Sequence, residues 1–157
     1  MAPKNTIFAI STPPGKSGVA IIRISGPMAA EVPTLFHFKI PRPRHATLVR
    51  MLDQKNDPID LGVALWFPAP ASFTGEDVFE LQIHGSRAVT ETILSILSSH
   101  KNFRLAEPGE FSKRAFENEK MDLVQAEGLA DLIDAETSQQ LRQAHLQLDG
   151  ILSKACQ

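Results

Sequence analysis

The first half of the chain carries short runs of apolar and β-branched residues, each bounded by proline, glycine or aspartate. Such runs are typical of strands in a sheet. They predict five strands, over Thr6–Ser11, Val19–Ser25, Thr47–Leu52, Gly62–Phe67 and Val78–His84. A turn-forming segment, Asp53–Pro58, lies between the third and the fourth of them and predicts a hairpin connection. We therefore expect these strands to form one mixed sheet.

The second half changes to the periodicity of helices. Apolar residues recur at helical spacing from Val89 to Leu97, which predicts an amphipathic helix over about 86–99. A shorter helix is expected around 111–116. Asp122, with Gln125 three residues later, has the form of a capping box and predicts the start of a third helix. A fourth begins near Thr137. The expected fold class is α+β, a mixed sheet with flanking helices, followed by the start of a helical domain.

The length and composition limit the class of protein. The 157 residues, of which 43% are hydrophobic and 22% charged, leave room for one domain plus an appendage. No apolar run approaches a membrane span, so we expect a soluble protein without membrane contact. Cys156 is the single cysteine, and the first residues lack the apolar core of a secretory signal. These features favour the cytoplasm.

Charge is unevenly distributed, although the net charge is only −2. Residues 1–60 carry eight Lys or Arg and four Asp or Glu, whereas acidic residues prevail in the rest of the chain. The nearest approach to a basic face is a set of five residues, Lys39, Arg42, Arg44, His45 and Arg50. Two interpretations stay open for it: a contact with RNA, or a solvated, proline-rich connector.

Arg23 and Glu80 are the first candidate residues for a functional site. Arg23 lies among isoleucines on a predicted strand, so its guanidinium is expected to be partly desolvated and to need a partner. On the strand Val78–His84, Glu80 shares a face with Gln82 and His84, opposite the apolar residues. One interpretation is an ion pair that locks two strands. The other is the polar floor of a pocket, because a carboxylate can accept two parallel N–H bonds from a fused amide and amine.

Lys120 is the third candidate, at the junction between two predicted helices. It is either an exposed lysine or a cation that reaches the same pocket to meet a carbonyl or carboxylate. Other signals fail. Gly15-Lys16-Ser17 resembles the end of a phosphate-binding loop, but Ile10 stands where that pattern needs a glycine. The histidines show no metal-ligand spacing and Cys156 has no neighbouring base, so neither a metal site nor a thiol enzyme is expected.

Three long segments carry a resemblance: Thr12–Gly26, Ser72–Gly85 and Glu107–Thr137. Together, and in this order, they resemble the N-terminal region of the tRNA modification GTPase family called MnmE or TrmE. The resemblance implies a fold similar to the tetrahydrofolate-binding domain of glycine-cleavage T-protein-like enzymes. It divides the chain into a folate-binding and dimerisation domain, residues 1–119, and the first part of the helical domain, residues 120–157.

The resemblance also implies ligands and partners. The family's folate-binding arginine, glutamate and lysine match Arg23, Glu80 and Lys120, and the implied ligand is 5-formyl- or 5,10-methylene-tetrahydrofolate. It supplies the one-carbon unit with which tRNA receives a carboxymethylaminomethyl group on its wobble uridine. Expected partners are a second copy of the chain, a flavin-dependent tRNA modification protein, and tRNA in the full complex. GTP, Mg²⁺ and K⁺ belong to a GTPase domain that these residues do not include.

Two other function classes stay open at this point. One is a purely structural dimerisation module, and the other is a stand-alone folate-dependent one-carbon transferase, for which fold analogy alone is weak support. We assign no catalytic residue within the chain. We therefore expect the 157 residues to be inactive on their own.

Overall fold

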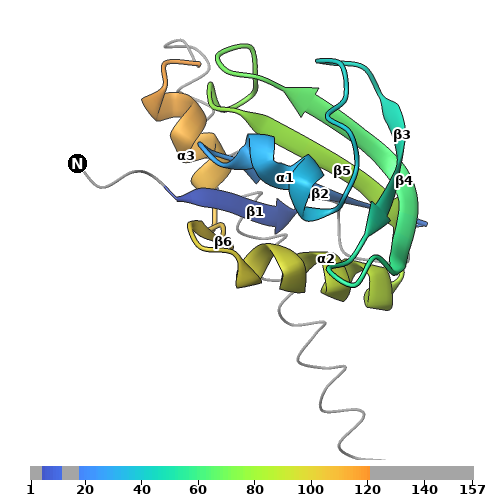
Figure 1. Cartoon of the computed structure of the whole chain (residues 1–157). Coiled ribbons are helices and arrows are strands. Elements are labelled where there is room, and N and C mark those ends of the chain that lie inside the picture. The colour runs from blue at the N-terminus through green and yellow to red at the C-terminus, as the bar shows by residue number, and fades with distance from the viewer. Residues whose placement is uncertain (1–4, 12–17, 121–157) are drawn as a thin grey trace, which may run out of the picture.

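A single six-stranded sheet forms the centre of the computed structural model, which describes residues 5–11 and 18–120 (Figure 1). The strands lie in the order β3-β4-β5-β2-β1-β6. Neighbours are antiparallel except β1 and β6, which are parallel. The bounds are β1 (Thr6–Ile10), β2 (Val19–Ser25), β3 (Thr47–Leu52), β4 (Pro58–Phe67), β5 (Val78–His84) and β6 (Phe103–Leu105). The predicted α+β class with one mixed sheet is confirmed.

The strands follow the sequence pattern closely. β2, β3 and β5 have the predicted bounds, and β1 ends one residue early at Ile10. β4 begins at Pro58, not at Gly62, because residues 58–61 continue to pair with β3. The short strand β6 was not predicted, since three residues cannot display a periodicity. It becomes a strand by pairing with β1.

The predicted hairpin joins β3 to β4. Its turn is closed by the carboxylate of Asp53, whose Oδ1 accepts hydrogen bonds from the backbone N–H groups of Lys55, at 2.8 Å, and Asp57, at 2.9 Å. Asn56 adopts a left-handed conformation there, with φ of 65°. Asparagine tolerates that conformation better than most residues, so the turn residues match the turn they form.

Four helical segments complete the described chain: the 3₁₀ turn η1 (Ala29–Glu31), α1 (Val32–Leu35), α2 (Arg87–Ser99) and α3 (Glu110–Glu117). α2 and α3 were predicted, and η1 and α1 were not. Ser86 caps α2, because its Oγ accepts a hydrogen bond from Val89 N at 3.2 Å. The helices predicted from Asp122 and from Thr137, and with them nearly all of the second predicted domain, lie outside the described residues.

The main core lies on one face of the sheet. Alternate residues of β2, β4 and β5, such as Ile22, Trp66 and Phe79, point to this face and are buried. The elements η1 to α1 and the helix α2 contribute the other half of the core, with Phe36 and Ile93 among its fully buried residues (Figure 1). In this core the apolar residues of the strands recur at every second position, and those of the helix recur at helical spacing, so both kinds of element turn their apolar side toward the same interior.

The second face of the sheet is covered at one side only. α3 packs Phe111 against Ile7 and Ala9 of β1. Residues of β2, β5 and β4 on the same face, including Arg23 and Glu80, are only half buried. Among the described residues, therefore, one face of the sheet is closed and the other is largely uncovered; we call the latter the open face. None of the helices in the described ranges is long and apolar enough to cross a membrane.

Candidate functional site

Arg23 and Glu80 meet on the open face of the sheet. They are direct partners in the antiparallel pairing of β2 with β5. Arg23 donates to one oxygen of Glu80, Oε1, from Nη2 at 3.2 Å and from Nε at 3.4 Å. The two side chains are 29% and 19% exposed. Within the described part of the chain, the second oxygen, Oε2, accepts no hydrogen bond.

Two aromatic rings flank the Arg23 guanidinium. Its central carbon lies 5.6 Å from the ring centroid of Phe73 and 5.9 Å from that of Phe111. These distances are within the range of cation–π contacts. Phe73 is 46% exposed and comes from the loop between β4 and β5, whereas Phe111 is buried and comes from α3. The charged pair thus lies beside one exposed ring, Phe73, on which a flat, conjugated ring could stack.

Lys120 is joined to the loop that carries Phe73. Its Nζ donates a hydrogen bond to the backbone oxygen of Pro70 at 3.0 Å. Asn118 fastens the same loop, because its side-chain nitrogen donates to Thr74 O at 2.8 Å. Gly75 makes the approach possible: its φ is +81°, and an added Cβ would come within 3.0 Å of Asn118 and 3.2 Å of Lys120. Lys120 and Arg23 therefore contact one short loop from two different elements.

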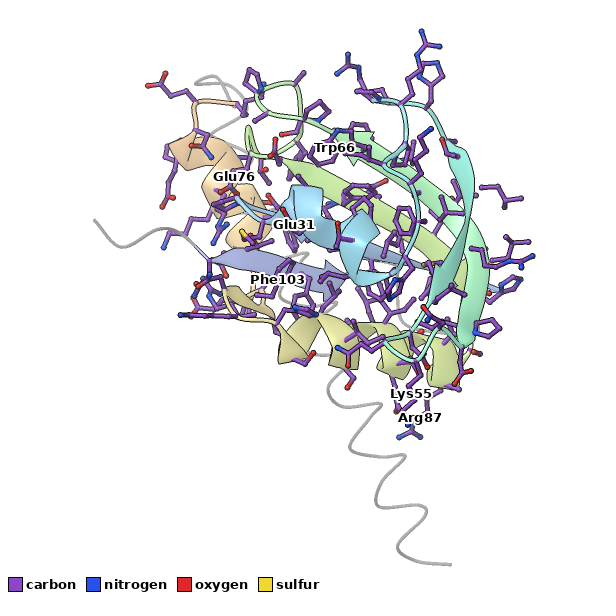
Figure 2. All side chains as sticks on the ribbon, viewed as in Figure 1. Glu31, Lys55, Trp66, Glu76, Arg87 and Phe103 are labelled. Carbon is purple, nitrogen blue, oxygen red and sulfur yellow. The ribbon has the colours of Figure 1, made fainter. Side chains whose placement is uncertain are left out.

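A buried charge network holds the other side of this loop. Arg114 on α3 is 5% exposed, and its Nη1 donates to both carboxylate oxygens of Glu76, at 3.1 and 3.2 Å. Its Nη2 donates to Asn5 O and to Glu110 Oε2. The buried hydroxyl of Ser25 donates to Glu76 Oε1 at 3.0 Å. Figure 2 shows Glu76 beside α3. Strand, loop and helix are thereby tied together next to Arg23.

Glu110 is the most strongly perturbed acid of this network. Burial opposes its ionisation, but hydrogen bonds from Arg104 and from the backbone of Glu107, with the charges of Arg104 and Arg114, outweigh that penalty and lower the pKa to about 2. Arg104 meets the carboxylate with two hydrogen bonds of 2.7 Å. The same bond raises the pKa of Arg104. Glu110 is therefore a permanent anion at neutral pH.

The structure brings the three sequence candidates to one region. Arg23 and Glu80 are in direct contact, whereas Lys120 joins them through the shared loop. Phe73, Glu76 and Arg114 were not identified as candidates. The spacing of Glu110 and Arg114, four residues apart on a helix, was the one local signal for the network. In the described residues no group of three or more His, Cys, Asp or Glu side chains could hold a metal ion.

Fold and site together define the class: an α+β domain, built on one mixed sheet, whose open face presents a charged pair between aromatic rings. The sequence profile described as "GTP-binding protein TrmE N-terminus" matches residues 6–120. The chain belongs to this family.

Full-length relatives carry the name tRNA modification GTPase MnmE. The protein of Wolbachia pipientis subsp. Culex pipiens is 57% identical over 150 residues, which is 95% of this chain and 34% of the relative. That of Rhodopseudomonas palustris is 54% identical over 147 residues, 94% of this chain and 33% of the relative. That of Pectobacterium carotovorum is 50% identical over 153 residues, 98% of this chain and 34% of the relative. The chain spans about a third of the length of these relatives.

Proposed function

We propose that this chain is the folate-binding, dimerising N-terminal part of a tRNA modification GTPase, with Arg23, Glu80 and Lys120 as its ligand-binding residues. When bound, the reduced folate supplies the one-carbon unit for modification of the wobble uridine. The observation that carries the proposal is the half-exposed Arg23–Glu80 pair on the open sheet face, with one carboxylate oxygen facing no donor of the described chain.

The carboxylate of Glu80 fits the pterin end of such a ligand. A pterin presents a ring N–H and an exocyclic amine side by side, and a carboxylate can accept both in parallel. Oε2 has no donor among the described residues, whereas Oε1 already accepts two hydrogen bonds from Arg23, so the ligand's second N–H would share Oε2 or replace one of the Arg23 bonds to Oε1. Arg23 places a positive charge beside the carboxylate. The exposed ring of Phe73 offers the ligand's flat ring a surface to stack on, and the buried Phe111 supports the Arg23 guanidinium from the other side.

Lys120 supplies a second cation at the edge of the same surface. An ammonium has three N–H donors, and Pro70 O takes one of them. The others can meet a carbonyl or carboxylate of the ligand. Because Lys120 is exposed and lies beyond the last described helix, it contributes little to packing. Its removal should leave the sheet and its core intact, but it takes away both the ammonium and the hydrogen bond that holds the loop at Pro70.

Calorimetry with 5-formyltetrahydrofolate tests the proposal. We expect Glu80→Gln, which keeps the shape and removes the charge, to lower affinity by roughly 10- to 150-fold, the equivalent of about 1.5–3 kcal/mol for a hydrogen bond to a charged group. Lys120→Ala is expected to weaken binding with a much smaller change in melting temperature than a substitution in the sheet core would cause.

Matched controls are Glu91→Gln and Lys101→Ala, which remove one exposed charge of each sign away from the site. Both should bind folate like the unmodified chain. If the wild type binds and neither Glu80→Gln nor Lys120→Ala changes the affinity, the binding site lies elsewhere. If the wild type does not bind folate at all, the proposal fails.

The proposal also covers the location, the oligomeric state, the partners and the fold relationship of the domain. We propose a cytoplasmic homodimer that works with a flavin-dependent partner protein and tRNA, and a fold related to the folate domain of glycine-cleavage T-protein-like enzymes.

A purely structural dimerisation role is the second candidate function. It is favoured by the exposed apolar side chains on β3 and β4, Leu48 at 66% and Leu61 at 49%. Stoichiometric folate binding would argue against a structural role alone.

A further inference from the structure

One continuous segment of the chain is free of acidic residues. From Val32 to Leu52 there is no Asp or Glu, although four arginines and lysines occur there: Lys39, Arg42, Arg44 and Arg50. The first three lie in the connection between α1 and β3, and all three are exposed. We call Lys39, Arg42 and Arg44 the basic loop. Arg50 lies further along, on β3, and is not part of it.

The basic loop is held firmly although its charges point outward. Phe36 and Pro41 are buried, and the ring of Phe38 lies 6.1 Å from that of Phe79 in an edge-on contact. Arg44 N donates to Trp66 O at 2.8 Å, which fixes the loop to the end of β4. His45 N donates to Arg42 O and closes a turn. Apolar side chains thus anchor the segment, and the cations are left in solvent at fixed positions.

The arginines of this segment differ from the others in their partners. Elsewhere in the described ranges each arginine has a carboxylate: Arg23 with Glu80, Arg87 with Glu91, Arg104 with Glu110 and Arg114 with Glu76. Arg42 and Arg44 have no carboxylate partner among the described residues. Unneutralised, exposed arginines on a rigid loop are suited to phosphate groups, because the planar guanidinium donates two parallel hydrogen bonds.

We propose that the basic loop binds the phosphate backbone of RNA. Several cations spread along a loop suit a chain of phosphates better than a single phosphate group. RNA is chosen over an anionic membrane because the inference rests on the proposed function, in which the substrate is a tRNA. The loop would position the nucleic acid without reading its sequence, since backbone contacts carry no sequence information.

The basic loop is anchored at one end of the sheet. Trp66, which Figure 2 labels at the end of β4, pairs with Phe79, the residue next to Glu80. β5 separates β4 from β2, so at about 4.8 Å per strand the anchor of the basic loop lies roughly 10 Å from the backbone of β2. Phe38 packs on Phe79 at the closed face, whereas Arg23 and Glu80 lie on the other face. An RNA held on the basic loop would therefore reach the folate site only around the end of the sheet.

A triple variant of the 157-residue chain, Lys39→Gln/Arg42→Gln/Arg44→Asn, tests the proposal with a fluorescent, unmodified tRNA transcript. Asparagine is chosen because residue 44 has φ of 60°. We expect at least a tenfold loss of affinity at low salt. The matched control, Lys55→Gln/Lys101→Gln/Lys113→Gln, removes the same charge from other exposed positions, and Lys55 lies at the end of the sheet away from Trp66 (Figure 2). It should bind tRNA like the wild type.

Salt dependence gives a second readout. If about three phosphates are neutralised, wild-type affinity should fall by roughly 20- to 40-fold between 50 and 200 mM salt. The slope for the basic-loop variant should be shallower by about 2 to 3. Equal affinities of the two triple variants would overturn the proposal. So would a wild type that binds phosphatidylserine vesicles but not tRNA, or that binds neither.

Folate calorimetry on the same variants separates this proposal from the one it rests on. The basic-loop variant should bind 5-formyltetrahydrofolate like the wild type. Loss of tRNA binding with folate binding retained supports the basic loop. A wild type that binds tRNA through the loop but does not bind folate would leave the RNA surface in place and refute the folate site.

Discussion

At the scale of single residues, Arg23 and Glu80 can perform two tasks with one contact. Arg23 compensates the charge of a half-buried carboxylate, and it donates only to Oε1, so the contact leaves room for a ligand. A fully buried and saturated pair would lock the strands but could bind nothing. The 29% and 19% exposure of the side chains is therefore compatible with both the structural and the binding role.

Glu110 gives a prediction for stability against pH. Its pKa is lowered to about 2 in the folded chain, from 4.5. A carboxyl with a depressed folded-state pKa stabilises the fold above the unfolded value, and this contribution is lost as pH falls from about 4.5 towards 2. We expect a loss on the order of 1–2 kcal/mol over that range, after screening by solvent. Urea titrations at pH 5, 4 and 3 measure it.

Glu110→Gln is the matching variant for this titration. It should be less stable than the wild type at pH 6, and the difference should shrink as the pH falls through the range in which the wild-type carboxyl becomes protonated. Glu91→Gln, at an exposed helical pair, should show no such convergence. A constant difference between Glu110→Gln and the wild type across the range would contradict the assignment.

At the scale of elements, the loop between β4 and β5 is fastened from two sides. Arg114 and Ser25 hold Glu76, while Asn118 and Lys120 hold the loop at Thr74 and Pro70. Ser72 Oγ also donates to Glu76 O within the loop. These contacts keep Phe73 over Arg23, so the shape of the candidate site depends on α3 as much as on the sheet.

Arg114→Ala should therefore be strongly destabilising. Arg114 and Glu76 are only 6% and 13% exposed, and removal of the cation leaves buried carboxylates without a partner. We expect a loss of roughly 3 kcal/mol in the free energy of unfolding, measured by urea denaturation. Arg87→Ala, at the exposed pair with Glu91, should cost less than about 0.5 kcal/mol. Similar costs for the two variants would mean that the network does not hold the loop.

At the scale of the whole molecule, the two faces of the sheet are unequal. In the described part of the chain one face is closed by α1 and α2, whereas the other is covered by α3 over β1 and by Phe73 beside Arg23 (Figure 1). On the open face a shallow groove is lined by apolar side chains that include Leu48, Leu61 and Val63. Exposed apolar side chains that adjoin one another often mark an interface. A second copy of the chain is the occupant that family membership suggests.

We therefore expect a homodimer that depends on Leu61. At tens of micromolar the wild type should sediment as a dimer, and Leu61→Lys, which places a charge on the groove, should shift it to monomer. Leu105→Lys is the control, because Leu105 is also exposed, at 61%, but lies on β6 at the opposite edge of the sheet. A monomeric wild type would contradict the dimer, and a dimeric Leu61→Lys would move the contact to another surface.

The sequence by itself determined the features that depend on neighbours along the chain. Strand alternation placed Glu80 on a polar face and a charged Arg23 among isoleucines, helical periodicity predicted α2, and Asp53 marked the hairpin turn. These features could be predicted because residue type and backbone period act over a few residues. The resemblance of three long segments also identified the family before the fold was known.

Only the tertiary structure decided which of these segments meet. Strand order places Glu80 opposite Arg23, which is 57 residues away in the sequence. Arg114 meets Glu76 across 38 residues, and β6 is a strand only because β1 pairs with it. Such contacts are stabilised by burial and by satisfying charges far apart in the chain. No local pattern records them, because the free energy that selects them exists only once the whole sheet has formed.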